Sequence, residues 1–315
     1  MTKRNSTVDI LRVIGLVLVI AAHCSFPEWF LQIREFDVVL LVFVSGMSYG
    51  LSQSESSYGE YVMRRFRRLV LPVWCFLIFF FAFFFLIGRR FSVSQILQSF
   101  MLLAGGIYFV WVYRIMLTSS LLNPLMKAAG ENKSMILLIL VSVLILGAND
   151  ALYQFVFARI GSAGKILEYL ITYTAGYGVI SFLGIEFVKM NRRERLTMTA
   201  VYAAVFAVSA VILRLPDFYD WKYPPMIYYI SYGLMCSGIL YTALEHVRGD
   251  NAVIRWLSAN CMNIFIWHIF AYYLLEFLSG ALLENVFVSF TFFLAAGILG
   301  AFLQEKIGRK LKEMI

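Results

Sequence analysis

The residues best suited to chemistry in this chain are an arginine and a histidine near its N-terminus. Arg12 and His23 stand eleven positions apart and enclose an apolar run from Val13 to Ala22. Eleven steps of about 100° return a helix to nearly the same face, about 16 Å further along its axis. Ionisable side chains inside an apolar helix are costly, and by default they mark a functional site or pathway. We therefore predict that both residues serve a functional site.

Histidine is the side chain best suited to proton transfer near neutral pH. Of the three histidines, His23 and His268 fall inside apolar segments and His246 at the end of one. A buried imidazole stays neutral and can accept a proton, which suits a general base acting on a hydroxyl. The alternative is a structural hydrogen bond between helices. Arg12, close to the end of its segment, could instead extend to the membrane interface.

A further cation, Arg114, lies well inside an apolar segment. Trp111 and Thr118 share its helix face at i−3 and i+4. Arg114 is therefore a further candidate for a functional role. The alternative for Arg114 is an ion pair with Glu186 or Glu276.

Four arginines in five residues precede the apolar segment that begins at Leu69, namely Arg64, Arg65, Arg67 and Arg68. Basic runs of this kind set membrane topology and contact lipid headgroups. Those roles explain the charge, but not the use of arginine without lysine. Guanidinium groups bind phosphates bidentately, so a phosphate-bearing ligand is the other interpretation.

Two weaker patterns allow packing or ligand binding. Ser45 and Gly46 are small residues within an apolar segment, where they permit close helix approach or leave room for a ligand chain. Tyr169, Tyr173 and Tyr177 form a stripe at i+4 spacing, for which packing is favoured over sugar stacking. No P-loop, dinucleotide or zinc-protease motif is present, and the histidines lack clustered co-ligands, so we expect no metal.

The composition is that of a membrane protein. The 315 residues are 61% hydrophobic and 15% charged, with a mean hydropathy of +0.78, whereas soluble domains are about 45–50% apolar and about 25% charged. Apolar stretches long enough to cross a bilayer recur throughout, which predicts an all-α polytopic membrane helix bundle. About ten transmembrane helices are expected, at residues 8–25, 36–53, 69–88, 101–122, 134–149, 166–188, 197–213, 225–245, 257–279 and 282–304.

The loop charges predict the orientation of this bundle. With the N-terminus in the cytoplasm, most lysines and arginines outside the spans fall on the cytoplasmic side, which favours N-in and C-in. Topology thus accounts for the net charge of +8, and we expect membrane lipid, not nucleic acid, as a partner. Residues 1–315 are expected to form a single integral-membrane domain without an appended soluble domain, and a homo-oligomer is compatible with it.

Four motifs, in order along the chain, carry a resemblance to a known family. The chain resembles the acyltransferase-3 family of integral-membrane acyltransferases. The matching motifs are Asp9 to Arg12 with His23, Val42 to Gly46, Arg65 to Arg68 with Pro72, and Asn263 to His268.

The resemblance implies an activity and a location. Such enzymes transfer an acyl group, usually acetyl from acetyl-CoA, to a hydroxyl of a cell-surface polysaccharide or a lipid-linked sugar. By this resemblance the chain is a multi-pass protein of the inner (cytoplasmic) membrane, with acyl-CoA as donor substrate and a sugar or polysaccharide as acceptor.

The resemblance also implies roles for single residues. His23 would be the general base or a transient acyl carrier, and Arg12 would orient or stabilise the site. Arg65 and Arg68 would hold the CoA phosphates. Polarisation of the thioester needs a donor near its carbonyl oxygen. The remaining candidates are Arg64 and Ser45 for the cofactor, and Arg114, His268 and Trp111 for the substrate or oxyanion.

A second class of function also fits ionisable residues within a membrane. The chain could be a proton-coupled transporter or flippase for a glycan or a lipid-linked intermediate, with Arg12 and His23 in its pathway. Many transporters are built from two repeated halves. No such repeat is visible in the sequence, which favours the acyltransferase.

Overall fold

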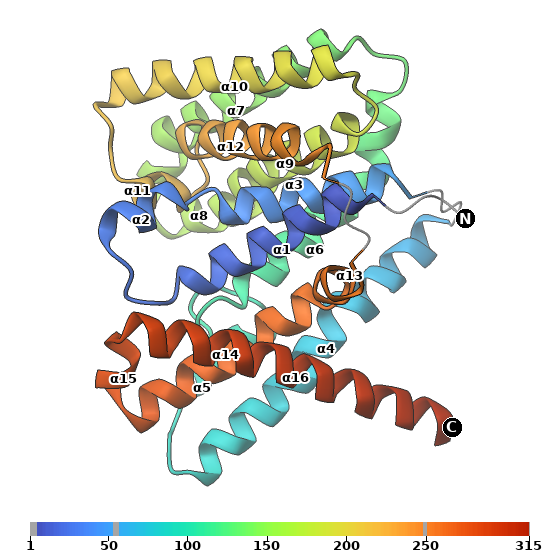
Figure 1. Cartoon of the computed structure of the whole chain (residues 1–315). Helices are drawn as coiled ribbons and strands as arrows, with labels where there is room; N and C mark the ends of the chain where they lie inside the picture. The colour runs from blue at the N-terminus through green and yellow to red at the C-terminus, as the bar shows by residue number, and fades with distance from the viewer. Residues whose placement is uncertain (1–4, 53–56, 248–250, 315) are drawn as a thin grey trace. The chain divides into compact units, whose positions relative to one another are not determined.

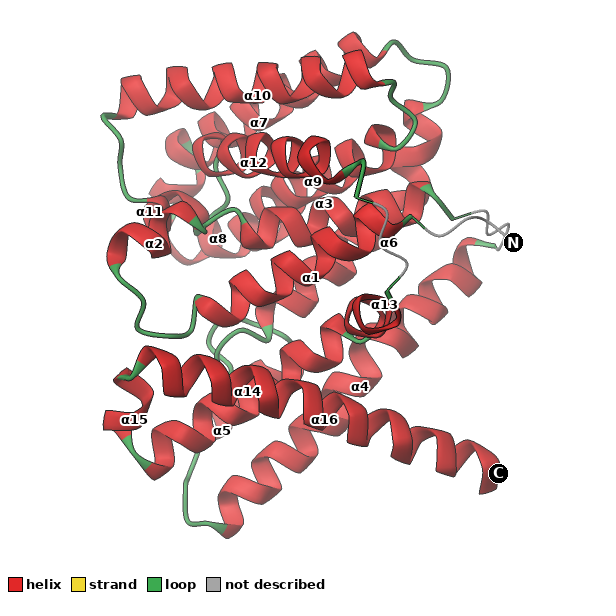
Figure 2. Ribbon diagram, viewed as in Figure 1, coloured by secondary structure: helices red, strands yellow, loops and turns green. Residues whose placement is uncertain are grey.

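The computed structural model describes residues 5–52, 57–247 and 251–314, and these residues form helices without any strand (Figure 2). The predicted all-α class is therefore confirmed. The chain divides into two compact units. Unit 1 comprises residues 1–11, 32–62 and 115–248, and unit 2 comprises residues 12–31, 63–114 and 249–315.

Unit 1 is built mainly from helices of the middle of the chain. Helix α3 packs against α9 and α12, while α10 packs on α12 and α7 on α9 (Figure 1). The bounds are α3 Asp37–Gly50, α7 Met135–Phe155, 3₁₀ turn η1 Phe157–Arg159, α8 Gly161–Leu167, π-helical turn η2 Glu168–Thr172, α9 Tyr173–Phe187, α10 Arg192–Leu213, α11 Phe218–Lys222 and α12 Ile227–Leu244.

Helices α3 and α9 approach closely because each places a glycine at the crossing. A Cβ on Gly46 would lie 2.1 Å from the backbone oxygen of Ser181, and one on Gly184 would lie 2.2 Å from that of Phe43. These separations leave no room for any side chain. Gly46 therefore serves close helix packing, as its size predicts.

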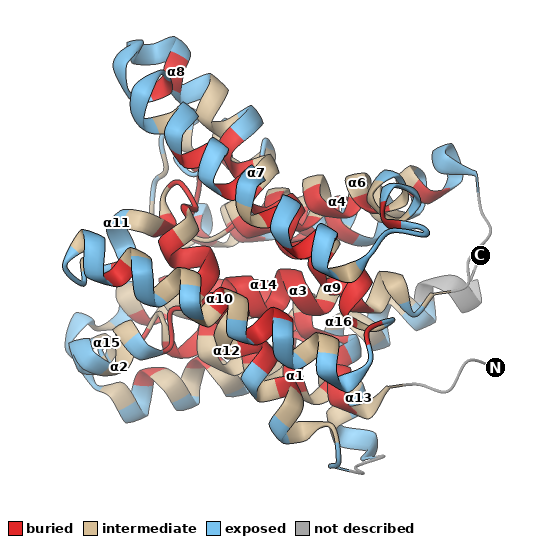
Figure 3. Ribbon diagram, turned by 90° about the horizontal axis from the view of Figure 1, so that it is seen from above, coloured by how far each residue is buried: buried red, intermediate tan, exposed pale blue. Residues whose placement is uncertain are grey.

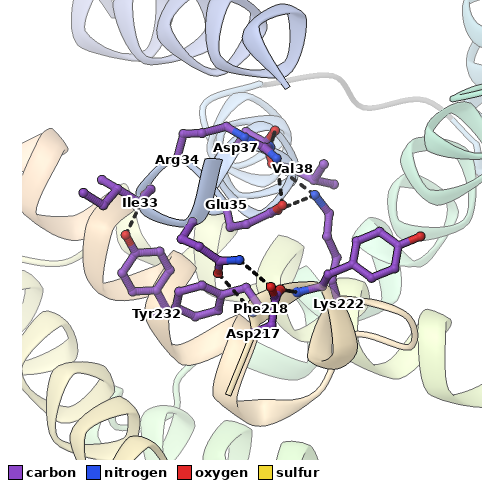
Figure 4. Close-up of polar contacts among 11 residues, drawn as sticks. Ile33, Arg34, Glu35, Asp37, Val38, Asp217, Phe218, Lys222 and Tyr232 are labelled. Atoms are coloured by element: carbon purple, nitrogen blue, oxygen red, sulfur yellow. Dashed lines mark hydrogen bonds and ion pairs between the residues drawn. The ribbon is translucent and has the colours of Figure 1, made fainter. Parts of the chain in front are cut away.

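Four ionisable side chains form a buried cluster at the start of α3, which we call the ion cluster (Figure 4). Arg34, Glu35, Asp37 and Lys222 are each at most 6% exposed. Arg34 donates to Asp37 at 2.6 Å and to Glu35 at 2.7 Å. Lys222 of α11 donates to Glu35 at 2.5 Å and lies 3.6 Å from Asp37. Two positive and two negative charges thus compensate one another.

The electrostatics of the ion cluster favour its charged form. Burial alone would lower the pKa of Lys222, but Asp37, Tyr223 and Glu35 outweigh it, so the pKa is raised. Burial likewise opposes the charge of Arg34, and the two carboxylates overcome it and raise its pKa. Lys222 and Arg34 therefore keep their charges at neutral pH, and their ion pairs hold α11 to the start of α3.

Unit 2 combines residues 12–31 and 63–114 with the C-terminal part of the chain, residues 249–315. Helix α14 packs along α16, where a Cβ on Gly300 would lie 2.3 Å from the Trp267 ring. The bounds are α1 Ser6–Ala21, α2 Glu28–Ile33, α4 Tyr58–Leu86, α5 Val93–Phe100, α6 Trp111–Gly130, α13 Ala252–Ala259, α14 Cys261–Leu278, α15 Gly280–Glu284 and α16 Val286–Met314. Helices α1, α2, α4 and α6 cross the boundary between the units.

Seven helices in the described residues are long and apolar enough to cross a membrane. They span Tyr58–Leu86, Met135–Arg159, Gly161–Phe187, Arg192–Leu213, Ile227–Leu244, Cys261–Leu278 and Val286–Lys310. Helix α10 exposes most of its apolar surface (Figure 3), as expected of a helix that faces lipid. Helices α1 and α3 have 16 and 14 residues and are too short to be among these seven helices.

The span predicted at residues 101–122 is wrong in its first half. Residues 101–110 form turns, and α6 begins only at Trp111. Two residues, Leu102 with φ 56° and Phe109 with φ 76°, adopt the left-handed conformation that a helix excludes. Gly105 and Gly106 add two poor helix formers between them. Hydrophobicity alone did not reveal this interruption.

Candidate functional site

The predicted site residues lie almost entirely in unit 2. Ser45 is the exception, because it belongs to α3 in unit 1. The residues in unit 2 are Arg12 of α1, His23, Arg64, Arg65 and Arg68 of α4, Trp111 and Arg114 of α6, and His268 of α14.

His23 lies in a turn and not on the helix that the sequence predicts for it. Helix α1 ends at Ala21, and the backbone nitrogen of His23 donates to Ile20 at 3.1 Å, as in a tight turn. Pro27 follows shortly afterwards and cannot donate a backbone hydrogen bond to prolong the helix. Arg12 and His23 therefore do not lie on one face of a single helix, as the sequence predicts, because only Arg12 belongs to α1.

The structure brings His23 directly against His268. Nδ1 of His23 lies 2.8 Å from Nε2 of His268, and the planes of the two rings are nearly parallel, at 4°. His268 is completely buried, whereas His23 is partly exposed. The pair, which we call the histidine pair, thus joins a reachable imidazole to an enclosed one.

Helix α14 fixes the enclosed member of the histidine pair. Phe265 packs against the His268 ring, with 5.0 Å between ring centroids. Gly297 of α16 lies close to α14 here, since a Cβ on it would be 2.9 Å from the Ile264 backbone oxygen and 3.7 Å from Cβ of His268. His268 is therefore held by close helix packing, which restricts its rotamers.

Phe109 also belongs to this site, and the sequence reasoning missed it. Its ring centroid lies 3.5 Å from that of His23, with 31° between the planes. It packs less closely on His268, at 6.4 Å. The nearby Gly105 and Gly106 were a signal, since paired glycines within an apolar run indicate a turn.

Arg12 makes a hydrogen bond that the sequence did not predict. Its guanidinium donates to the hydroxyl of Ser258 of α13 at 2.7 Å. A polar side chain on a neighbouring helix thus fixes this cation within unit 2.

Three arginines gather in unit 2. The electrostatic neighbours of Arg68 include Arg65, three residues earlier on α4, and Arg12 of α1. Charges of the same sign repel one another. An anion with several charges would relieve this repulsion.

The first turn of α6 carries Trp111 and Arg114, both partly exposed. Glu276 and Glu186, the carboxylates that the sequence offers as ion-pair partners for Arg114, each form an ion pair with another residue. Glu276 accepts from Arg89 at 2.6 Å, and Glu186 accepts from Lys189 at 2.6 Å.

Comparison with known proteins identifies the family. A family model described as an acyltransferase domain matches residues 5–304, nearly the whole chain. The chain belongs to the acyltransferase-3 family. No curated protein and no solved structure gives a significant match.

Membership of the acyltransferase-3 family, together with the seven long apolar helices, makes the chain a multi-pass membrane acyltransferase. The match spans both units. Of the four motifs that resemble acyltransferase-3 sequences, the first, third and fourth contribute His23, the arginines of α4 and His268 to unit 2. The second places Ser45 and Gly46 in the helix crossing of unit 1.

Proposed function

We propose that this chain is an acyl-CoA-dependent O-acyltransferase that acetylates a hydroxyl of a cell-surface polysaccharide or a lipid-linked sugar. One observation carries the proposal: a partly exposed histidine is hydrogen-bonded to a fully buried one, within the unit that also gathers the arginines. A general base needs this combination of access and a fixed ring.

The arginines supply the donor side of the reaction. CoA carries several phosphate charges at one end and its thioester at the other. Arg65 and Arg68 would bind the phosphates, with Arg64 and Arg12 adding positive charge. The repulsion between Arg12, Arg65 and Arg68 supports this role, because a bound polyanion removes it.

In the proposed reaction one proton moves from the acceptor to the leaving thiolate. His23 takes the proton of the acceptor hydroxyl as its oxygen attacks the thioester carbonyl. The C–O bond forms, the C–S bond breaks, and the imidazolium returns the proton to the sulfur of CoA. Arg114 and Trp111 are candidates for contact with the substrate or its developing oxyanion.

The membrane arrangement belongs to the same proposal. We place the N- and C-termini in the cytoplasm of a cell whose inner membrane holds about ten spans of this chain. The excess of basic loop residues on that side supports the orientation. The arginines of α4 then meet CoA, which is a cytoplasmic metabolite.

Transfer of labelled acetyl from acetyl-CoA tests the proposal. Purified protein in lipid vesicles is incubated with donor and with lipid-linked or polymeric sugar acceptors, and alkali-labile label on the acceptor is measured. We expect labelled ester with wild type and none with His23→Ala.

The same vesicles test the transporter alternative. Movement of the lipid-linked sugar across the bilayer is measured without acyl-CoA. Flux that depends on His23, together with no ester on any acceptor, would replace the acyltransferase proposal with a transport function.

A further inference from the structure

Helix α13 connects the arginines of unit 2 to α16, and Ser258 makes the connection. The guanidinium of Arg12 donates to the Ser258 hydroxyl at 2.7 Å, although the two residues stand 246 positions apart. Ser258 is 2% exposed, so the surrounding protein holds its hydroxyl in place. An arginine side chain has many rotamers, and a fixed partner restricts them. The hydrogen bond therefore gives the Arg12 side chain a defined direction.

The position of α13 is itself held by Glu305 of α16. Oε2 of Glu305 accepts from the indole Nε1 of Trp256 at 2.8 Å and from the side-chain amide of Asn260 at 3.4 Å. These two donors stand on either side of Ser258 in the sequence. At the start of α13, the side chain of Asn251 caps the first turn. Ser258 therefore belongs to a segment that is held at both ends.

Arg12 lies near the other cations that we propose for the site. It is an electrostatic neighbour of Arg68, which also has Arg65 as a neighbour on α4. It is likewise an electrostatic neighbour of Cys261, the first residue of α14. A polyanion bound by the arginines of α4 would therefore meet the charge of Arg12 as well.

A hydroxyl is a suitable partner for a cation that has to bind an anion. It accepts an N–H of the guanidinium but carries no charge, so this hydrogen bond leaves the positive charge of Arg12 undiminished. Arg34 of the ion cluster provides the contrast, because it contacts two carboxylates. Negative charge on a partner weakens the attraction for a further anion. The contact with Ser258 thus orients Arg12 without neutralising it.

We infer that Ser258 is a positioning residue for the acyl donor: its hydrogen bond directs the guanidinium of Arg12 toward the phosphates of CoA, and Glu305 holds α13 in the place that this requires. The inference rests on the proposed function, since it takes acyl-CoA as the donor. Ser258 stands outside the four motifs that resemble acyltransferase-3 sequences, so it adds a residue that they do not assign.

Donors with and without phosphates test this role. Wild type and Ser258→Ala in lipid vesicles are compared for CoA binding and for acetyl transfer from acetyl-CoA and from S-acetylpantetheine, which has the same thioester arm but no phosphate. We expect Ser258→Ala to raise the dissociation constant of CoA and the KM for acetyl-CoA about 3–10-fold, the size of one ordinary hydrogen bond. The kcat with acetyl-CoA and the rate with S-acetylpantetheine should stay near the wild-type values. Equal losses with both donors, or unchanged CoA binding, would overturn the inference.

Ser289→Ala is the matched control for this variant. Ser289 is also a buried serine of unit 2, and its hydroxyl donates to a backbone oxygen of its own helix. The control should bind CoA as wild type does, and thermal unfolding should show that both variants are folded. An equally large loss of CoA affinity in Ser289→Ala would mean that removal of any buried hydroxyl is enough, and it would overturn the assignment.

A double-mutant cycle shows whether Ser258 acts through Arg12. Arg12→Ala removes the cation and should weaken CoA binding more than Ser258→Ala does. If the hydroxyl works by directing Arg12, adding Ser258→Ala to Arg12→Ala should cause no further loss. Additive losses would show that Ser258 acts on CoA binding by another route, which contradicts the positioning role.

Trp256→Phe tests the support of α13 and leaves Ser258 in place. It keeps an aromatic ring but removes the N–H that Glu305 accepts. We expect the dissociation constant of CoA to rise, though by less than in Ser258→Ala, and the rate with S-acetylpantetheine to stay unchanged. Wild-type affinity for CoA in Trp256→Phe would contradict the part that Glu305 has in the inference.

These measurements separate the inference from the proposed function. Absence of both CoA binding and acetyl transfer in wild type would remove the two together. CoA binding and acetyl transfer by wild type, with Ser258→Ala indistinguishable from it in both, would leave the function standing and remove the inference.

Discussion

The ion cluster of unit 1 and the histidine pair of unit 2 are both buried polar groups in an apolar protein, yet they differ in how they are compensated. In the cluster, Lys222 and Arg34 each meet carboxylates within 2.7 Å, and all four side chains are closed to solvent. In the pair, two imidazoles meet each other, and His23 is partly exposed.

This difference distinguishes a structural group from a reactive one. Charges that are fully paired cannot exchange protons or bind a ligand without breaking their contacts, and they act to hold α11 against the start of α3. A neutral imidazole that is partly exposed can accept a proton from a substrate. The comparison predicts that changes in the pair affect chemistry and that changes in the cluster affect stability.

The largest expected effect is that of His23→Ala on acetyl transfer. Loss of a general base typically slows a reaction about 10²–10⁴-fold, and stability should change little because His23 is partly exposed in a turn. Transfer rate and thermal unfolding are measured on the same purified preparation.

The control for this variant is His246→Ala, since the side chain of His246 is 80% exposed. It should leave the transfer rate unchanged. A His23→Ala protein with wild-type rate, or one that fails to fold, would remove the distinction between the two regions.

Lys222→Met should produce the largest loss of stability. It leaves two buried carboxylates with one cation, and breaking a buried pair in this way costs about 3–5 kcal/mol. The free energy of unfolding in detergent micelles measures the loss. Lys133→Met, a change at an exposed lysine of the same unit, is the matched control.

A second substitution sharpens this result. Lys222→Met combined with Glu35→Gln restores equal charge with Arg34 and Asp37, and it should recover part of the lost stability. If the double variant is less stable than Lys222→Met by the full cost of both changes, charge compensation does not explain the cluster.

Arg65→Ala with Arg68→Ala should weaken CoA binding without affecting the fold. Each hydrogen bond to a charged group contributes about 1.5–3 kcal/mol, so the dissociation constant should rise about tenfold or more. The loss should be smaller for a CoA analogue that lacks the 3′-phosphate. Arg67→Ala, at an exposed position in the same run, is the control. Equal losses for both analogues would argue against contact with that phosphate.

The smallest effect concerns pH. The raised pKa of Lys222 means that its charge stabilises the fold below the pKa of an unfolded lysine, about 10.4, and that this contribution disappears only as pH rises through the higher folded value. Between pH 6 and 9 the contribution of the Lys222 charge should therefore be constant. The difference in free energy of unfolding between wild type and Lys222→Met, measured across this range, checks it. A difference that changes between pH 6 and 9 would contradict a fixed charge on Lys222.

The sequence predicted the helical class and the family, because these depend on local patterns, and it named most of the residues that we propose for the site. Apolar stretches marked the helices, and Arg65, Arg68 and His268 stood in recognisable motifs. The close crossing of α3 and α9 also followed from the size of Gly46.

What the sequence did not predict depends on contacts between distant residues. The hydrogen bonds of His23 to His268 and of Arg12 to Ser258 each join residues about 245 positions apart, beyond any local pattern. Phe109 reads as one apolar residue in a long run, and its left-handed backbone reflects tertiary packing. The ion cluster escaped notice because Arg34 and Lys222 resembled ordinary loop charges.

The most direct test of the account compares acetyl transfer per folded molecule in His23→Ala and Lys222→Met. Both proteins are purified at low temperature, the folded fraction is measured by unfolding, and the rate of ester formation is divided by it. The account predicts that His23→Ala is stable and inactive, and that Lys222→Met is unstable but retains most of its rate per folded molecule. An active His23→Ala protein, or a folded Lys222→Met protein without transfer, would contradict it.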